Sequence, residues 1–303
     1  MVQYPGICLC ISLCILFCLP AALIAQQAQA PAKTLSFQYE ELTAPEFVQA
    51  VEKAGKTCII PFGILEKHGP HLPLGTDLLD SRQVALTAAR EEYVLVFPQY
   101  YFGQIYEAKH QPGTIAYSPT TIWTLLQETC DELHRNGITK IIIVNGHGGN
   151  NSLLPYFAQA QLEAPHDYVV YVVGIIWSAQ GEPKHKSNPV TDMHAGESET
   201  SLSLIARPDL VHLDRTSQES GADQARLSAL PERLYTGIWW YARFPNHYAG
   251  EGAAASRELG EFEAKTWING VAQAIRAVKA DQESLRLQDE FFERSKHPLD
   301  TRQ

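Results

Sequence analysis

The sequence predicts an α/β fold with three layers, α/β/α, in which helices cover both faces of a mainly parallel central sheet. Short apolar runs alternate with longer helical patterns, as in successive βαβ units. The run from Ile141 to Val144 is apolar throughout, which is typical of a parallel strand that is buried on both faces. Polar motifs that contain glycine follow several of the runs, at the carboxyl ends of strands where open α/β sheets bind ligands.

Start and stop signals place the elements in order. Thr43 and Glu46 form a capping box that starts the first helix. Ser118 and Pro119 start a later helix, which Gly137 ends. Apolar runs predict strands at residues 57–65, 93–98, 140–144 and 168–177. Helices are expected at residues 43–54, 78–92, 118–136, 151–162, 197–206 and 251–281.

The first thirty residues differ in composition from the rest of the chain. Residues 1–30 contain no Asp, Glu, Lys or Arg, and residues 7–25 are mostly apolar. A cleaved secretory signal fits this pattern, and so does a retained anchor, which needs ~20 apolar residues. Both interpretations predict an exported protein, periplasmic or extracellular, with a membrane as partner only if the segment is retained. The expected division is this leader, one domain at residues 31–282 and a charged C-terminal tail at residues 283–303.

The overall composition is that of a folded, acidic protein. Hydrophobic residues make up 45% of the 303 residues and charged residues 19%, so a sizeable core is expected. A net charge of −10 without a basic run argues against a nucleic-acid partner, which needs clustered Lys and Arg. After the leader only Cys58 and Cys130 remain, both in apolar patterns typical of small buried side chains. A disulfide between them is left open.

The first polar motif follows the strand expected at residues 57–65. It reads Glu66-Lys-His68-Gly-Pro-His71-Leu-Pro-Leu-Gly-Thr-Asp77. Glu66 and His68 are two residues apart, so in extended backbone they point the same way. With Asp77 they form a carboxylate and imidazole set that suits Zn²⁺, Mn²⁺ or Fe²⁺. The alternative is that Asp77 caps a helix and that the other two are surface residues.

The second motif, Asn145-Gly-His147-Gly-Gly-Asn150, directly follows the Ile-Ile-Ile-Val strand. Glycine lets the backbone approach a ligand closely, and the loop presents His147 at the carboxyl end of a central strand. A phosphate-binding turn and a simple tight turn are alternatives. A phosphate loop does not need a central histidine, so the first motif favours a metal role for His147.

The third motif, Asp192-Met-His194-Ala-Gly-Glu197-Ser-Glu199-Thr-Ser201, starts a helix after the fourth strand. Glu197 and Glu199 are two residues apart at its N-terminus. We expect one of them to face the site and the other to bond backbone N–H groups. The alternative is that both merely suit the helix dipole. Three such motifs at strand ends are much less expected by chance than one.

Together the three motifs resemble those of the creatininase (creatinine amidohydrolase) family. Two shorter segments are similar as well, namely His110-Gln-Pro112-Gly113-Thr114 and Gly250-Glu-Gly252. The resemblance covers about residues 35–280. It implies a creatininase-like α/β/α fold, a homo-oligomer that is usually a hexamer, and one or two divalent metal ions. Zn²⁺ is the expected metal, with Mn²⁺ or Fe²⁺ as alternatives.

The resemblance also assigns roles to individual residues. It implies metal ligands at Glu66, His68, Asp77 and His147, with Asp77 as the bridge. His194 matches a position proposed as a proton donor, and Glu199 matches an acidic position that we expect to bind metal. We expect a catalytic role for Glu197. Substrate contacts are expected from His71, His110, Asn150 and His247, the last lying near an aromatic cluster at residues 239–244.

Two positions depart from creatininase itself. Gly149 stands where creatininase carries a glutamate ligand, and we expect Glu197 to supply the missing carboxylate. Val190 stands where creatininase carries a tryptophan that packs against the substrate ring. Both departures argue for another substrate than creatinine. Other branches of the family hydrolyse formamides or cleave a short peptide, and the Gly-His-Gly-Gly-Asn form is closer to those.

The expected function is therefore metal-dependent hydrolysis of a C–N bond in a cyclic amide, formamide or related small molecule. A metal-activated water would attack the carbonyl carbon, and His194 would protonate the leaving nitrogen. Glu197 or Glu199 would take the proton from the water. Two alternatives are a metal-dependent peptidase acting on a short peptide and a non-catalytic, exported protein that binds a metal or ligand. The aromatic cluster is expected to pack in the core or at a subunit interface, with a substrate lid as the alternative.

Overall fold

The computed structural model describes residues 1–3, 6, 34–231, 233–300 and 302. The predicted signal or anchor at residues 1–30 lies outside the described residues, apart from residues 1–3 and 6. The chain divides into the units Met1–Thr34 and Leu35–Gln303. Within the described residues, no helix has both the length and the apolar character that a membrane crossing requires.

A four-stranded sheet forms the centre of the second unit. Its strands are β1 (Thr57–Phe62), β2 (Leu95–Val96), β3 (Lys140–Asn145) and β4 (Val169–Val173). They lie in the order β2-β1-β3-β4, and every pairing is parallel. The register places Phe62 of β1 opposite Asn145 of β3, so the two central strands end level with each other. The predicted α/β class with a parallel sheet is confirmed.

Eight α-helices and several short 3-10 turns surround the sheet in the described part of the chain. The helices are α1 (Ala44–Lys53), α2 (Thr76–Glu91), α3 (Pro119–Arg135), α4 (Leu153–Ala160), α5 (Glu197–Ala206), α6 (Trp239–Arg243), α7 (Arg257–Ala280) and α8 (Glu283–Ser295). The 3-10 turns are η1 (Tyr39–Glu41), η2 (Tyr106–Ala108), η3 (Gly148–Asn151), η4 (Gln161–Glu163), η5 (Pro208–Leu210), η6 (Leu213–Gln218) and η7 (Gly252–Ala254).

Local signals account for most of these boundaries. The Ser118 hydroxyl accepts the Thr121 N–H at the start of α3, and Gly137 follows the helix with a φ of +92°. The last long helix begins later than residue 251, because η7 intervenes and Ser256 caps α7 by accepting the Leu259 N–H. Residues 283–303, expected as a charged tail, include α8, whose first turn donates to the Asp281 carboxylate.

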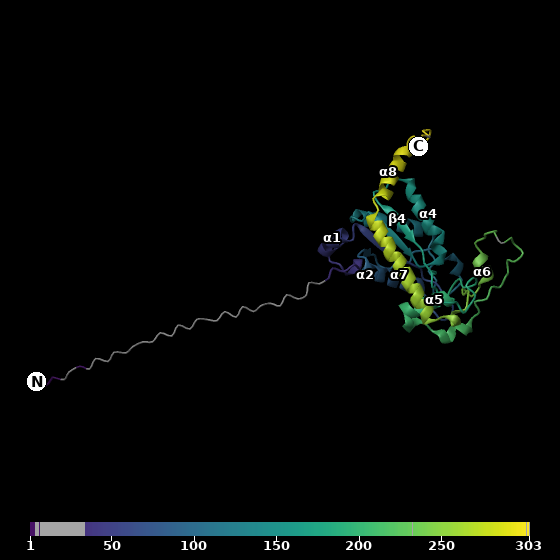
Figure 1. Ribbon diagram of the computed structural model, residues 1–303, viewed down its shortest axis with the longest axis horizontal. Helices are drawn as coiled ribbons and strands as arrows, with labels where there is room; N and C mark the ends of the chain where they lie inside the picture. The colour runs from purple at the N-terminus through teal and green to yellow at the C-terminus, as the bar shows by residue number, and fades with distance from the viewer. Residues whose placement is uncertain (4–5, 7–33, 232, 301, 303) are drawn as a thin grey trace. The chain divides into compact units, whose positions relative to one another are not determined.

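Side chains on the two faces of the sheet build two separate cores. Cys58, Ile60 and Phe62 alternate with Ile59 along β1 and pack beneath α1, α3 and α4, whereas Ile59 faces α2, α5 and α7. Figure 1 shows the long helix α7 with α5 beside its N-terminal end. Cys58 and Cys130 are both buried as free thiols in the first core, so the disulfide left open does not form.

Helix α7 packs tightly against α5 at Gly260. A Cβ on Gly260 would lie 2.0 Å from the Ser201 carbonyl oxygen, so α5 has to move if residue 260 carries a side chain. We expect Gly260→Ala to lower the free energy of unfolding by ~1–3 kcal/mol, because overpacking outweighs the ~1 kcal/mol gain in helix propensity.

Urea unfolding followed by circular dichroism measures this effect. Gly237→Ala is the control, because a Cβ there meets no heavy atom of the described residues within 4 Å. A Gly260→Ala variant as stable as the natural chain would show that the α5–α7 contact is not tight.

Candidate metal centre

The three polar motifs meet at the carboxyl edge of the sheet. Glu66 and His68 lie in the loop after β1, and Asp77 lies in the first turn of α2. His147 follows β3, and Glu199 lies in the first turn of α5. Glu66, His68, Asp77 and His147 are buried, with exposed fractions of 5% or less. Such burial of charged groups is costly unless each one is paired.

Two groups of ligand atoms share Asp77. Glu66, Asp77 and His147 form one group, and His68, Asp77 and Glu199 form the other; the atoms within each group lie within 4.8 Å of one another. Asp77 Oδ1 lies 3.0 Å from His68 Nε2, and Asp77 Oδ2 lies 3.1 Å from His147 Nδ1. The Asp77 carboxylate therefore spans two imidazoles, one in each group.

Backbone carbonyl groups decide which nitrogen of each imidazole faces the carboxylates. His147 Nε2 lies 3.0 Å from the Gln104 carbonyl oxygen, and His68 Nδ1 lies 3.2 Å from the Glu66 carbonyl oxygen. A carbonyl oxygen only accepts, so these nitrogens carry the protons of the neutral rings. His147 Nδ1 and His68 Nε2 are the ring nitrogens that face the carboxylates, and each would bind a metal after losing its proton, as metal-binding imidazoles do.

The charges of this cluster call for a cation. Burial lowers the pKa of His68, but Asp77 and its hydrogen bond outweigh this effect and raise the pKa to about 10. Burial also lowers the pKa of His147, but the Glu66 carboxylate outweighs burial and holds this pKa well above the ordinary value. Glu66 Oε1 and Asp77 Oδ2 are buried, and both lie close to the same nitrogen, His147 Nδ1, at 2.9 and 3.1 Å. Carboxylate oxygens and imidazole nitrogens that converge in a buried space fit divalent metal ions.

Two glycines allow α2 to reach this edge of the sheet. A Cβ on Gly63 would lie 2.7 Å from the Leu78 nitrogen, and a Cβ on Gly146 would lie 2.7 Å from the Asp77 carbonyl oxygen. Any larger residue at either position would push the first turn of α2 away. The two glycines after β1 and β3 therefore place Asp77 between the other ligands.

Glu66 is oriented by a pair of residues from the segment before α7. Trp240 Nε1 donates to His247 Nδ1 at 2.8 Å, and an indole nitrogen only donates. His247 Nε2 therefore carries the ring proton and donates it to Glu66 Oε2. The aromatic cluster at residues 239–244 thus reaches the site through Trp240, a role that the sequence analysis missed.

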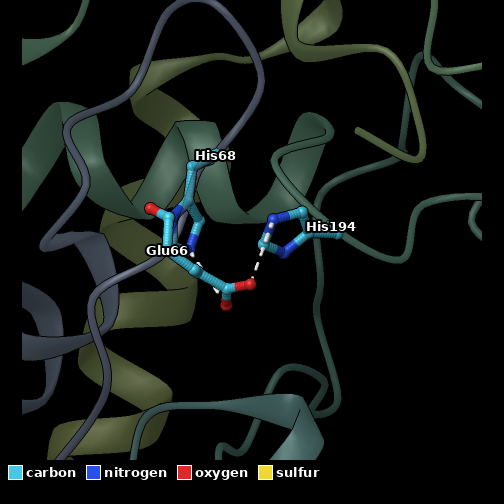
Figure 2. A group of neighbouring side chains, drawn as sticks. All are labelled: Glu66, His68 and His194. Atoms are coloured by element: carbon cyan, nitrogen blue, oxygen red, sulfur yellow. Dashed lines mark hydrogen bonds and ion pairs between the residues drawn. The ribbon is translucent and has the colours of Figure 1, made fainter. Parts of the chain in front are cut away.

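His194 lies on the pocket side of the cluster. Figure 2 shows Glu66, His68 and His194 grouped together, with the Glu66 carboxylate in contact with both rings; Glu66 Oε2 lies 3.9 Å from His194 Nε2, and the centroids of the two rings lie 4.5 Å apart. His194 Nε2 also lies 2.8 Å from the Lys67 carbonyl oxygen, and Nδ1 lies 3.6 Å from Glu199 Oε2. Burial lowers the pKa of His194, although Glu66 opposes this effect, so a neutral ring is favoured near pH 7.

Glu197 and three expected substrate contacts have other partners. The Glu197 carboxylate accepts the Lys186 and Ser187 N–H groups and lies outside the two ligand groups. His71 Nε2 contacts the Thr200 hydroxyl at 2.8 Å. His110 Nε2 lies 2.8 Å from the Pro245 carbonyl oxygen, and the Asn150 amide oxygen accepts the Gln104 N–H. Of the four residues expected to contact substrate, His247 lines the pocket described next.

A pocket of about 450 Å³ opens onto the cluster. Its polar lining includes Glu66, Glu107, His147, His194, Glu199 and His247, and its apolar lining includes Ile175, Trp177, Met193, Trp239 and Trp240. Sequence analysis missed Glu107. A Cβ on Gly149 would lie 2.9 Å from Glu107 Oε1, so the missing side chain at residue 149 leaves room for this carboxylate. In the sequence, the absence of a side chain at Gly149 is the signal that could have pointed to a residue such as Glu107 at this position.

Comparisons with known proteins give a family match and several similar sequences. Residues 40–275 match the family model described as creatinine amidohydrolase. Creatinine amidohydrolase of Pseudomonas putida is 28% identical over 254 residues, which cover 78% of this chain and 95% of that protein. A mycofactocin precursor peptide peptidase of Mycolicibacterium smegmatis is 29% identical over 233 residues, which cover 75% and 87% of the two chains.

Solved structures extend the likeness to the fold. A crystal structure of creatininase superposes with a TM-score of 0.69 at 25% identity and covers 82% of this chain and 99% of the other. A structure described as creatininase with Mn gives 0.67 at 26% identity and covers 81% and 100%. A variant described as the Zn-Zn type gives 0.66 at 26% identity and covers 81% and 99%. The creatininase-like fold expected from the sequence is confirmed.

Asp77 and Asp80 provide a matched pair of variants. Asp80 is also buried in α2, but burial raises its pKa well above the ordinary value and the Ser203 hydroxyl donates to it. Asp80 lies outside both ligand groups, so Asp80→Asn should leave metal content unchanged. Asp77→Asn removes the shared carboxylate and should cost at least one equivalent of bound metal. Elemental analysis after reconstitution measures both, and equal metal content in the two variants would contradict a bridging role for Asp77.

Metal affinity should rise with pH. In the metal-free protein the raised pKa of His68, about 10, keeps a proton on the ring that a metal must displace. Affinity should therefore rise ~tenfold per pH unit for each proton released, up to that pKa. For the metal-free fold, the His68–Asp77 pairing stabilises below the ordinary histidine pKa and is lost as pH rises through about 10. Mn²⁺ titrations at pH values of roughly 6.5, 7.5 and 8.5 test this; a constant affinity would contradict it.

Proposed function

The chain belongs to the creatininase family, and from that premise we propose that it is a metal-dependent amidohydrolase that cleaves a C–N bond of a cyclic amide, formamide or related small molecule. One observation carries the proposal: imidazole nitrogens and carboxylate oxygens converge around the buried Asp77 carboxylate, and Glu66, His147 and Glu199 of this cluster line a pocket. A protein that only binds a ligand does not require a histidine such as His194 between this cluster and the pocket.

We assign two divalent metal sites to the two ligand groups. Glu66, Asp77 and His147 would hold one ion, and His68, Asp77 and Glu199 the other. The Mn and Zn-Zn forms of creatininase support this assignment, and Zn²⁺, Mn²⁺ and Fe²⁺ all suit such ligands. When bound, such ions lower the pKa of water towards neutrality and polarise a carbonyl oxygen.

The protein groups around the ions have separate tasks. Trp240 and His247 hold the Glu66 carboxylate in one orientation, and the Gln104 carbonyl group does the same for the His147 ring. His194 contacts both the cluster and the pocket, and its neutral ring can take up a proton and deliver it to the leaving nitrogen. No serine or cysteine nucleophile is needed in this mechanism.

We assign to Glu199 the metal-binding carboxylate that the sequence analysis expected from Glu197. Glu199 lies with His68 and Asp77 and lines the pocket, which supports this assignment. Glu197 is a positioning residue, because its carboxylate holds the backbone of Lys186 and Ser187. The Glu197 N–H in turn donates to Asp192, which ties the loop to the start of α5.

The pocket walls favour a substrate with a positively charged or N–H-rich group. Glu107 presents a carboxylate to the pocket, and Trp177, Trp239 and Trp240 supply aromatic surface. Aromatic faces and a carboxylate together attract an ammonium or amidine group. Val190, which stands in place of a tryptophan of creatininase, is 82% exposed and does not line the pocket. We therefore expect no contact between Val190 and a substrate bound in this pocket.

Cleavage of a short peptide is the second candidate function. The mycobacterial peptide peptidase aligns over 87% of its own length, and the aromatic lining of the pocket could accept peptide side chains. Export of the protein and its assembly as a homo-oligomer are further proposals, supported by the composition of residues 1–30 and by the family resemblance. Cell fractionation and sedimentation test these two points separately from the chemistry.

A substrate panel tests the proposed function. It contains lactams, creatinine, formamides and short peptides, each with and without an amino group. We expect turnover of small amides that EDTA abolishes and Mn²⁺ or Zn²⁺ restores, and a loss in kcat of ~10²–10⁴-fold in His194→Gln with its metal content retained. Amino-bearing substrates should have the higher kcat/KM, and Glu107→Gln should remove that preference.

Other outcomes of the panel would contradict particular parts of the proposal. Cleavage of peptides alone would favour the second candidate. Turnover that persists in EDTA, or an acyl-enzyme trapped by hydroxylamine, would rule out the metal-dependent mechanism.

A further inference from the structure

A second group of potential metal ligands lies apart from the Asp77 centre. Glu182 and His185 belong to the loop between β4 and α5, and Glu263 belongs to α7. Their ligand atoms lie within 4.8 Å of one another, and His185 Nε2 lies 3.0 Å from Glu182 Oε1. None of the three belongs to the groups that share Asp77. The cluster joins two segments that are about eighty residues apart in sequence.

Glu263 is the feature of this cluster that requires explanation. It is 1% exposed, and neither carboxylate oxygen has a hydrogen-bond partner among the described residues. Burial raises its pKa to about 9, although the nearby Ser198 side chain opposes this effect. His185 Nδ1 is buried and also lacks a hydrogen-bond partner in the described part of the chain. A buried carboxylate that accepts no hydrogen bond is costly unless it is protonated or binds a cation, and an imidazole and a second carboxylate lie within ligand distance of Glu263.

Neighbouring carboxylates differ from Glu263 because backbone groups satisfy them. Asp192 accepts the Glu197 and Ser198 N–H groups at the start of α5. Glu197 accepts the Lys186 and Ser187 N–H groups, and its Oε2 atom lies 3.7 Å from His185 Nδ1. These two acids explain how the loop is folded, but they leave Glu263 unsatisfied. The loop thus holds His185 and Glu182 beside an acid whose two oxygens accept no hydrogen bond among the described residues.

Solvent can reach the cluster through a hollow of about 330 Å³. Glu182, His185 and Asp192 line it, and so do His194 and Glu199 of the centre described above. An ion therefore has an entry path, and the two regions share a wall. His194 belongs to the same loop as Glu182 and His185, so an ion that fixes this loop also affects the placement of His194.

We propose that Glu182, His185 and Glu263 bind one further divalent transition-metal ion, which ties the loop between β4 and α5 to helix α7. Two carboxylates and one imidazole suit Zn²⁺ or Mn²⁺ better than Ca²⁺, which prefers oxygen ligands alone. The role is structural, because all three ligands come from this chain and hold two of its segments together. The site does not depend on the substrate or on the mechanism of the proposed hydrolase.

Zinc stoichiometry of the full-length protein tests this site. The variants are Glu263→Gln and His185→Gln, and the control is Glu261→Gln, the same change at an exposed position of α7. Each protein is loaded with Zn²⁺, freed of excess metal and analysed for bound zinc, with circular dichroism to check folding. We expect Glu263→Gln and His185→Gln each to hold one zinc fewer than the natural chain. Glu261→Gln should hold as many as the natural chain.

Hydrogen exchange of the loop gives a second, independent measurement. Zn²⁺ should slow amide exchange across residues 178–192 in the natural chain and in Glu261→Gln, but not in Glu263→Gln. If Glu263→Gln and His185→Gln fold and bind as much zinc as the natural chain, the site does not exist. If instead zinc is lost equally in Glu261→Gln, the loss does not report on this cluster and the proposal fails as well.

Discussion

The functional edge of this fold depends on one contact, the Asp77 carboxylate between the His68 and His147 rings. All three groups are buried, and a backbone carbonyl group contacts one nitrogen of each ring, so the other nitrogen faces the carboxylate. In water the carboxylate and the two imidazoles would separate, or the imidazoles would take up protons. In a buried space it persists only with a counter-charge, which two divalent ions would supply.

Several elements of the fold position Asp77, His68 and His147 for this contact. Parallel strands β1 and β3 end level with each other, so the loops that follow them emerge side by side. Gly63 and Gly146 let the first turn of α2 lie against those loops, and the residues of α5 close the opposite side. The segment before α7 adds Trp240 and His247 behind Glu66. Each ligand is thus held by an element whose own position is fixed by packing.

The fold class, the parallel sheet and the three polar motifs could be predicted from the sequence. They depend on local signals, namely the spacing of apolar residues, helix-capping residues and glycine-rich turns. Residues that act across long separations were beyond its reach. Trp240 contacts the ligands through His247, and Glu107 fills space that Gly149 leaves, yet neither relation is visible along the chain. Glu197 and Glu199 look equivalent in sequence; only the folded loop at Lys186 and Ser187 separates the capping carboxylate from the one in the cluster.

A crystal structure of the Mn²⁺-loaded protein, with anomalous scattering used to locate manganese, tests the central claim most directly. The account predicts two anomalous peaks on either side of the Asp77 carboxylate. One should lie against Glu66 and His147, and the other against His68 and Glu199. The absence of any peak within ligand distance of Asp77 would contradict the account, because the buried histidines would then have to balance the carboxylates by protonation alone.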